Sequence, residues 1–240
     1  MSNKNLNSEN VDVWVRGASL HQMKALETAA RHFDKNDALD VHTLEALYGQ
    51  ESSFGVSRRH RGISGAAGDF QVEKKTAERL GLYVSKENDE RFDVDKASNA
   101  GAQYLKLLDD CFRTETSLLV DLKTIPVSDA EERKLFSIAA YNAGEGTIAK
   151  AQQLTKQANF DPEKWHDVKK FLNQTGISVD KATEIREYVG IVIAFEQEFN
   201  EKSPNRKEKK LLKPMSATRS HSKIGHWITK LKQHIFIEDR

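Results

Sequence analysis

Glu51 is the first residue whose type and position could support catalysis. It follows Leu44, Leu47 and Tyr48 at spacings of three and four, so a helix here would end its apolar stripe on a carboxylate. Partial burial and the negative end of the helix dipole both disfavour the anion and raise the pKa of the carboxyl group. A carboxyl group with a raised pKa suits a general acid at neutral pH. A glutamate near a helix end is more often an ordinary surface residue, so this spacing needs independent support.

Two later segments combine glycine, small residues and polar side chains in a pattern that suits a binding groove. Residues 65–72 read Gly-Ala-Ala-Gly-Asp-Phe-Gln-Val, and residues 139–146 read Ala-Ala-Tyr-Asn-Ala-Gly-Glu-Gly. The glycines of the first segment would let the backbone turn tightly and approach a ligand closely. In the second segment Gly144 can cap a helix, which would leave Tyr141 and Asn142 at an element end where a cleft can form.

These two segments and residues 51–54 (Glu-Ser-Ser-Phe) together resemble the soluble-type lytic transglycosylase domain of the lysozyme-like superfamily. In that family a Glu-Ser-x-Phe segment closes a helix and a Gly-Ala-x-Gly-Leu-Met-Gln segment lines the groove. An Ala-Ala-Tyr-Asn-Ala-Gly-x-Gly segment supplies the opposite wall. Residues 99–105 and 183–189 resemble two further segments of the family less closely, so the resemblance covers roughly residues 40 to 195.

The resemblance implies that Glu51 is the catalytic acid and base. It implies substrate contacts from the following side chains: Ser52, Gln71, Tyr141, Asn142 and Tyr188. Structural interpretations stand beside these roles, because Gln71 could be a buried amide and Tyr188 a core tyrosine. Tyr141 and Asn142 could mark a helix C-terminus and nothing more. We expect no cofactor and no metal site.

The implied substrate is peptidoglycan, cleaved between N-acetylmuramic acid and N-acetylglucosamine. Protonated Glu51 would donate to the glycosidic oxygen, and its carboxylate would then take the proton from the muramoyl C6 hydroxyl. That hydroxyl attacks the anomeric carbon of its own sugar, which gives a 1,6-anhydromuramoyl end without consuming water. Because the nucleophile is internal, a second carboxylate is unnecessary, unlike in ordinary glycosidases.

The sequence departs from the family inside the groove segment. Asp69-Phe70 replaces the family's Leu-Met, and Glu73 lies two positions after Gln71, where goose-type lysozymes carry an acid that helps to activate water. Asp69 and Glu73 are therefore possible second carboxylates, and a muramidase is the alternative chemistry. Solvated loop charge is the structural interpretation of both, and it is the preferred one for Glu73. The basic group at residues 58–61 is assigned no role, because a charge run is usually a solvated face.

Apolar spacing predicts an all-α or predominantly α domain from about residue 15 to 200, with a short β excursion near 60–72. Residues 1–14 form a polar segment whose first part is expected to be frayed, and residues 201–240 form a basic linker with a short amphipathic helix. Asp40 is a plausible N-cap for the helix that carries Glu51. The other helices are predicted over 18–33, 74–81, 95–112, 129–143, 145–158, 163–173 and 179–199.

Composition restricts the partners of the 240-residue chain. Its 37 Lys and Arg nearly balance its 36 Asp and Glu, so no overall charge draws it to nucleic acid or anionic lipid. The single Cys111 excludes an intramolecular disulfide. The first residues lack an apolar run, so we expect no secretory signal and no transmembrane segment. Action at the cell wall is implied, by an unknown export route. A noncatalytic wall-binding component of a phage tail or secretion apparatus, recruited through the basic tail, is the third alternative.

Overall fold

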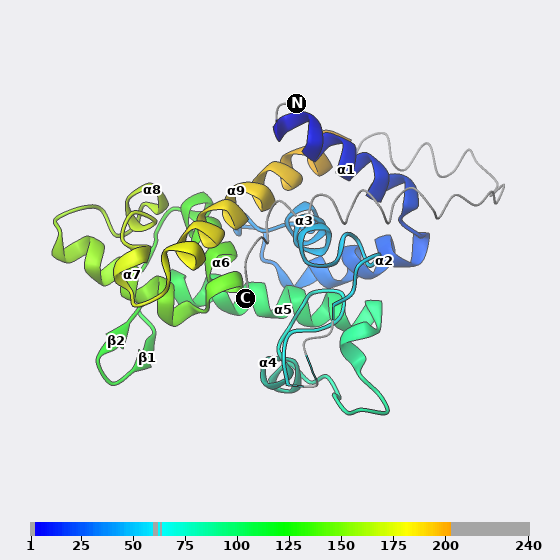
Figure 1. The fold of residues 1–240 in the computed structure, drawn as a ribbon, viewed down its shortest axis with the longest axis horizontal. Coiled ribbons are helices and arrows are strands. Elements are labelled where there is room, and N and C mark those ends of the chain that lie inside the picture. Colours follow the sequence, from blue (N-terminus) through cyan, green and yellow to red (C-terminus); the bar gives the residue numbers. More distant parts are fainter. Residues whose placement is uncertain (1–2, 60–61, 63, 203–240) are drawn as a thin grey trace. The chain divides into compact units, whose positions relative to one another are not determined.

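A computed structural model describes residues 3–59, 62 and 64–202, and this part of the chain is predominantly helical (Figure 1). The predicted fold class, an all-α lysozyme-like domain, is confirmed. The α-helices are α1 (Asn3–Gly17), α2 (Leu20–Ala29), α3 (Val41–Ser52), α4 (Lys74–Arg79), α5 (Val94–Arg113), α6 (Ala130–Ala143), α7 (Glu145–Gln157), α8 (Trp165–Val168) and α9 (Val179–Lys202). Short 3-10 turns are η1 (Ala30–His32), η2 (Glu90–Phe92) and η3 (Leu172–Gln174).

Helix α3 starts and ends where the local sequence dictates. The Asp40 carboxylate accepts hydrogen bonds from the backbone N–H groups of His42 and Thr43, which satisfies two donors that the first helical turn leaves open. The helix ends where Ser53 and Phe54 adopt left-handed backbone angles, with φ of 51° and 60°. The predicted N-cap and the predicted end near Glu51 are both confirmed.

The long helix α9 organises the core around α3. It packs along α3, α6 and α1, and Figure 1 shows it, in yellow to orange, crossing close to these helices. Helix α5 packs against α6 and α2. Most of α3 is buried, including fully covered Leu44, Leu47 and Tyr48. A helix surrounded in this way holds its last turn in a fixed place, as a catalytic group requires.

Strands are few in the described residues. β1 (Ser117–Leu119) and β2 (Leu122–Lys123) form an antiparallel hairpin that the sequence analysis does not predict. In the segment near 60–72, where a β excursion is predicted, an isolated antiparallel bridge joins Ala67 to Val72. The excursion is thus a single bridge within a turn.

Two local expectations need correction. Residues 3–12 belong to helix α1 instead of being frayed, because Val11 and Trp14 are buried against the core and stabilise the helix. The helix predicted over 163–173 is divided into α8 and η3. The predicted C-terminal amphipathic helix lies outside the described residues, and the domain boundaries stay a prediction. Among the described helices, none is both long and apolar enough to cross a membrane.

Candidate active site

Glu51 lies in the last turn of α3 and meets α9. Its side chain is half-buried, and its Oε1 accepts a hydrogen bond of 2.5 Å from the Tyr188 hydroxyl. Tyr188 is 5% exposed and comes from the middle of α9. These residues are 137 positions apart, and the packing of α3 on α9 brings them together.

The protonation of Glu51 is set mainly by burial. Burial raises its pKa from the usual value to about 7, and the negative charge of Glu184 adds to the increase. The hydrogen bond from Tyr188 and the positive charges of Arg59 and Lys181 lower the pKa in part. Near neutral pH the carboxyl group therefore exists in both protonation states. A group of this kind can donate a proton in one step and accept one in the next.

The turn after α3 is built from side chains that face inward. The Ser52 hydroxyl donates to the Tyr48 carbonyl oxygen at 3.1 Å and accepts from the Gly55 N–H at 3.0 Å. Gly55 has a φ of 81°, and a Cβ there would lie 2.4 Å from the Tyr48 hydroxyl, so a side chain cannot fit. Ser52 is 1% exposed, and its contacts fix the helix end that carries Glu51. The substrate contact predicted for Ser52 stays untested beside this structural role.

The groove segment is braced from within by Gln71. Its amide nitrogen donates to the carbonyl oxygens of Arg59 at 3.0 Å and Gly68 at 2.9 Å, and its backbone is left-handed with a φ of 48°. A Cβ at Gly68 would lie 1.9 Å from the Arg91 carbonyl oxygen, which explains the glycine. The two donated hydrogen bonds support the structural interpretation of Gln71, and its predicted substrate contact stays a prediction.

The end of α6 contacts the groove segment through Tyr141. The Tyr141 hydroxyl donates to the Phe70 carbonyl oxygen at 2.9 Å, and the negative charge of Glu51 raises the pKa of Tyr141 in addition to burial. Its ring packs on that of Tyr104 with centroids 5.1 Å apart. Tyr141 therefore joins α6 to the segment that carries Gln71.

Asn142 belongs to a three-membered polar contact with two residues of α9. Its Nδ2 donates to Glu184 Oε1 at 3.1 Å, and its Oδ1 accepts from the Lys181 ammonium at 3.1 Å. Lys181 also binds Glu184 Oε1 at 2.8 Å. The amide orientation of Asn142 is thereby fixed.

Lys181 and Glu184 are not among the site residues predicted from the sequence. A signal was available, because Lys181, Glu184 and Tyr188 follow one another at spacings of three and four and so share one face of α9. That spacing alone does not indicate that this face of α9 belongs to the site. The face is identified by its contact with Glu51, which lies on α3.

The two possible second carboxylates lie in different environments. Asp69 has no exposed surface, and its Oδ1 lies 2.6 Å from Arg58 Nε. Burial raises the pKa of Asp69 to about 6, although the Arg58 charge and the Tyr48 hydroxyl lower it in part. Glu73 is exposed at the start of α4. Asp69 is therefore enclosed away from solvent water, whereas Glu73 is open to it.

Together these features define a lysozyme-like protein in which a glutamate with a pKa raised to about 7 lies at the end of a buried helix. Residues 29–164, more than half of the chain, match the family described as the Transglycosylase SLT domain. The chain belongs to this family. The matched range contains Glu51, the groove segment and the end of α6, whereas Tyr188 lies beyond it.

The curated proteins that are similar to this chain also carry the name of a transglycosylase. A membrane-bound lytic murein transglycosylase F of Desulfosudis oleivorans is 31% identical over 134 residues, which cover 55% of this chain and 25% of that protein. The proteins of that name from Histophilus somni and Pasteurella multocida are 32% and 31% identical, over 56% and 62% of the chain and 24% and 27% of their own lengths. The chain thus spans about a quarter of the length of the curated relatives it matches.

Proposed function

We propose that this chain is a peptidoglycan lytic transglycosylase that cleaves the β-1,4 bond between N-acetylmuramic acid and N-acetylglucosamine. The observation that carries the proposal is the environment of Glu51, a half-buried carboxyl group with a pKa of about 7 that accepts a hydrogen bond from Tyr188. Membership of the family and the names of the curated relatives support the same substrate.

Glu51 acts twice in this mechanism. Its protonated carboxyl group first gives a proton to the glycosidic oxygen, and the bond from that oxygen to the anomeric carbon of the muramoyl residue breaks. The carboxylate then accepts the proton of the muramoyl C6 hydroxyl, whose oxygen forms the new bond to the same anomeric carbon. Proton and electron pairs balance without water, and Glu51 returns to its protonated form.

Tyr188 and Asn142 support these steps from the neighbouring helices. The Tyr188 hydroxyl fixes one oxygen of Glu51, which leaves the other to exchange protons with the substrate. Asn142 has its amide orientation set by Lys181 and Glu184, and it offers its remaining amide hydrogen to a sugar substituent. Ser52 and Tyr141 shape the helix ends that carry Glu51 and Asn142, and Gln71 braces the groove segment that Tyr141 contacts.

Muramidase activity is the alternative, and Glu73 is the residue that favours it. Because this carboxylate is exposed, it could activate a water molecule, whereas Asp69 is enclosed and paired with Arg58. The internal attack is preferred because it needs only Glu51. A noncatalytic wall-binding role is a further alternative, and it would leave the raised pKa of Glu51 without a purpose.

Action at the cell wall follows from the proposed substrate. Recruitment to a phage tail or a secretion apparatus through residues 201–240 remains part of the proposal, and these residues fall almost entirely outside the described part of the chain.

Digestion of purified peptidoglycan in ¹⁸O-labelled water tests the proposal. Transglycosylation predicts muropeptides with 1,6-anhydro ends, lighter by one water than reducing ends and free of ¹⁸O in mass spectra. Reducing ends that carry ¹⁸O, lost in a Glu73→Gln variant, would establish the muramidase instead. Wall binding without any released fragment would establish the noncatalytic role.

A further inference from the structure

The turn that follows Glu51 has an unusual backbone. Ser53, Phe54 and Gly55 are consecutive residues with positive φ, at 51°, 60° and 81°. Glycine adopts this left-handed conformation freely, but Ser53 and Phe54 carry side chains, and for such residues the conformation costs free energy. A turn of this kind persists only where surrounding contacts hold it in place.

The same turn closes the end of α3 around Glu51. The Ser53 N–H donates to the Gly49 carbonyl oxygen at 2.9 Å, and the Phe54 N–H donates to the Tyr48 carbonyl oxygen at 3.2 Å. Glu51 lies within the stretch of chain that these two hydrogen bonds close. The place of its carboxyl group therefore depends on whether the turn keeps its shape.

Gln22, near the start of α2, donates two hydrogen bonds to this region. Its Nε2 donates to the Phe54 carbonyl oxygen at 3.3 Å and to the Tyr48 hydroxyl at 3.0 Å. A Cβ at Gly55 would lie 3.3 Å from the same nitrogen, so the amide sits directly against the turn. One side chain thus holds both residues whose backbone hydrogen bond closes the helix end.

The oxygen of the Gln22 amide is bound to the start of α2. Its Oε1 accepts from the Ser19 N–H at 2.8 Å, and the Ser19 hydroxyl accepts from the Gln22 N–H at 3.1 Å, which completes a capping box. Glutamate could also cap in this way, but when ionised it has no hydrogen to donate to the turn. Glutamine serves both ends, so its side chain bridges the start of α2 and the end of α3.

Trp14 of α1 packs on the same turn. Its ring is 8% exposed and stacks on that of Phe54 with centroids 6.4 Å apart. A Cβ at Gly49 would lie 2.5 Å from the Trp14 ring, so the indole rests on the backbone of α3. Trp14 and Gln22 both precede residues 29–164, which match the family. The contacts that brace the turn thus come from outside the matched range.

We propose that Gln22 is a positioning residue, which holds the left-handed turn after α3 and thereby keeps Glu51 in place against Tyr188. Trp14 supports the same turn through its ring. The proposal deepens the function proposed above, on which its activity readout rests. Gln22 acts through the backbone of the turn and does not contact the substrate in this account.

Gln22→Glu separates this role from the capping of α2. The ionised carboxylate still accepts from the Ser19 N–H, but it donates nothing and repels the Phe54 carbonyl oxygen. We expect kcat for soluble peptidoglycan fragments to fall about tenfold and KM to change less than about twofold, because a displaced Glu51 impairs proton transfer more than binding. An unchanged kcat, or an effect confined to KM, would overturn the proposal.

Ser19→Ala is the matched control at the same contact. It removes the hydroxyl that caps α2 and leaves Gln22 its two hydrogen bonds to the turn. The variant should lose the stability that a helix cap provides, measured by urea unfolding, while kcat stays within about twofold of the wild type. If Ser19→Ala lowers kcat as far as Gln22→Glu at an equal loss of stability, the role of Gln22 is merely structural.

Gly49→Ala tests the contribution of Trp14. Alanine is normally more favourable than glycine inside a helix, so helix propensity alone predicts a gain in stability. Here the added Cβ would push against the buried Trp14 ring, and we expect a lower kcat instead. A Gly49→Ala variant that is more stable than the wild type and fully active would show that Trp14 does not hold the turn.

The pKa of Glu51 supplies a readout that needs no activity. It is followed by NMR in protein labelled with ¹³C at glutamate carboxyl carbons, with Glu51→Gln used to assign the signal. Burial is the main reason that the pKa of Glu51 is about 7, so a released helix end should lower it toward its usual value. Gln22→Met adds no charge and should lower this pKa by at least about 0.5, whereas Ser19→Ala should leave it unchanged.

The two readouts can fail separately. An unchanged or raised pKa of Glu51 in Gln22→Met would overturn the role of Gln22, whatever the activity. If wild-type protein cleaves no peptidoglycan, the proposed function fails, while the NMR titration still decides whether Gln22 positions Glu51.

Discussion

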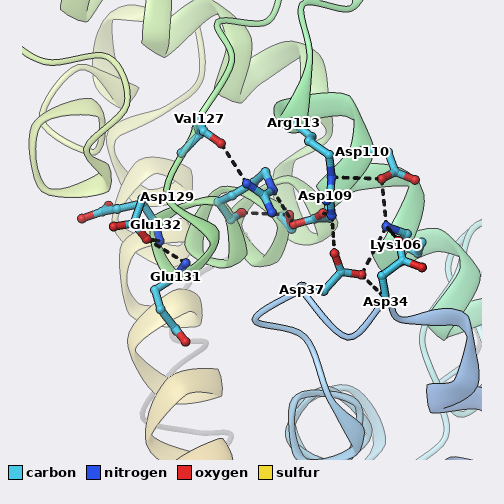
Figure 2. A network of polar contacts seen from close by, with 12 residues as sticks. Asp34, Asp37, Lys106, Asp109, Asp110, Arg113, Val127, Asp129, Glu131 and Glu132 are labelled. Atoms are coloured by element: carbon cyan, nitrogen blue, oxygen red, sulfur yellow. Dashed lines mark hydrogen bonds and ion pairs between the residues drawn. The ribbon is translucent and has the colours of Figure 1, made fainter.

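Two groups of buried carboxylates in this protein face opposite electrostatic surroundings. One is the network of Figure 2, in which Asp109 contacts Arg113 Nη2 at 2.5 Å. Asp109 also contacts Arg133 Nε at 2.9 Å. Asp37 in the same network contacts Arg113 and Lys106. The other group is the site of Glu51, where the direct contact is the neutral hydroxyl of Tyr188 and the cations act from further away.

The direct partner decides what a buried carboxylate can do. Burial raises the pKa of Asp37, but the Asp34 N–H and the cations Arg113 and Lys106 lower it below its usual value. Burial raises the pKa of Glu51 to about 7, and Arg59 and Lys181 lower it only in part. Asp37 is thus a permanent anion that ties α5 to the loop before α3, and Glu51 is free to exchange a proton.

The largest effect on stability is expected in the network. Asp109 has no exposed surface and Arg133 is 4% exposed, so Asp109→Ala leaves buried positive charge without its partner. Breaking a buried pair in this way costs about 3–5 kcal/mol. Urea unfolding monitored by circular dichroism measures the loss. Asp110→Ala is the matched control, since Asp110 is 48% exposed and its removal costs no more than about 1 kcal/mol. Equal losses of unfolding free energy in the two variants would show that the buried ion pairs of Asp109 stabilise the protein no more than the exposed ones of Asp110.

Neutralising Glu51 should stabilise the protein. Its pKa is raised from 4.5 to about 7, so the wild-type protein loses stability as the pH rises through this window. Glu51→Gln avoids that loss and should be more stable by about 3 kcal/mol at pH 8, with the difference vanishing below the usual glutamate pKa. Urea unfolding at several pH values measures this.

Asp37→Asn should change the stability of the protein in the opposite direction to Glu51→Gln. Because the pKa of Asp37 is lowered, its ionised form stabilises the fold above the usual aspartate pKa, and this contribution is lost as the pH falls through the folded value. Asp37→Asn should therefore destabilise the protein at pH 8 and cost progressively less in acid. The same sign for both substitutions would refute the contrast between the sites.

Removing the hydroxyl of Tyr188 should change activity, and the expected free-energy change is the smallest of those considered. Tyr188→Phe deletes the hydrogen bond that lowers the pKa of Glu51, so the alkaline limb of the pH profile should move upward. Activity at neutral pH should fall about tenfold, the value of one hydrogen bond to a charged group. Tyr83→Phe, a change at a 60% exposed side chain, serves as the control and should leave the alkaline limb and the activity at neutral pH unchanged. An unshifted limb in Tyr188→Phe would show that the contact does not control Glu51.

Most helices could be predicted from the sequence because their apolar residues repeat at helical spacing. Helices α3, α5, α6, α7 and α9 appear close to their expected bounds. Helix α1 could not be predicted, because Val11 and Trp14 are buried against partners far along the chain, many of them in α9. The hairpin of β1 and β2 is too short for an alternating pattern to be recognised.

The site could be predicted only in part for a similar reason. Glu51 is identifiable because helix spacing and neighbouring motifs agree, and its raised pKa follows from local burial. The contacts of Lys181 and Glu184 with Asn142, and of Arg58 with Asp69, depend on how separate elements pack. No pattern within one segment encodes such pairings.

The contrast between the Asp109 network and the site of Glu51 depends on Glu51 being the residue that transfers the proton in catalysis. The most direct test compares the initial rates at which wild-type and Glu51→Gln protein release anhydro-muropeptides from purified peptidoglycan. The account predicts that Glu51→Gln folds, binds the substrate and loses activity by a factor of about 1,000 or more. Release of anhydro-muropeptides by Glu51→Gln at a rate near that of the wild type would contradict it.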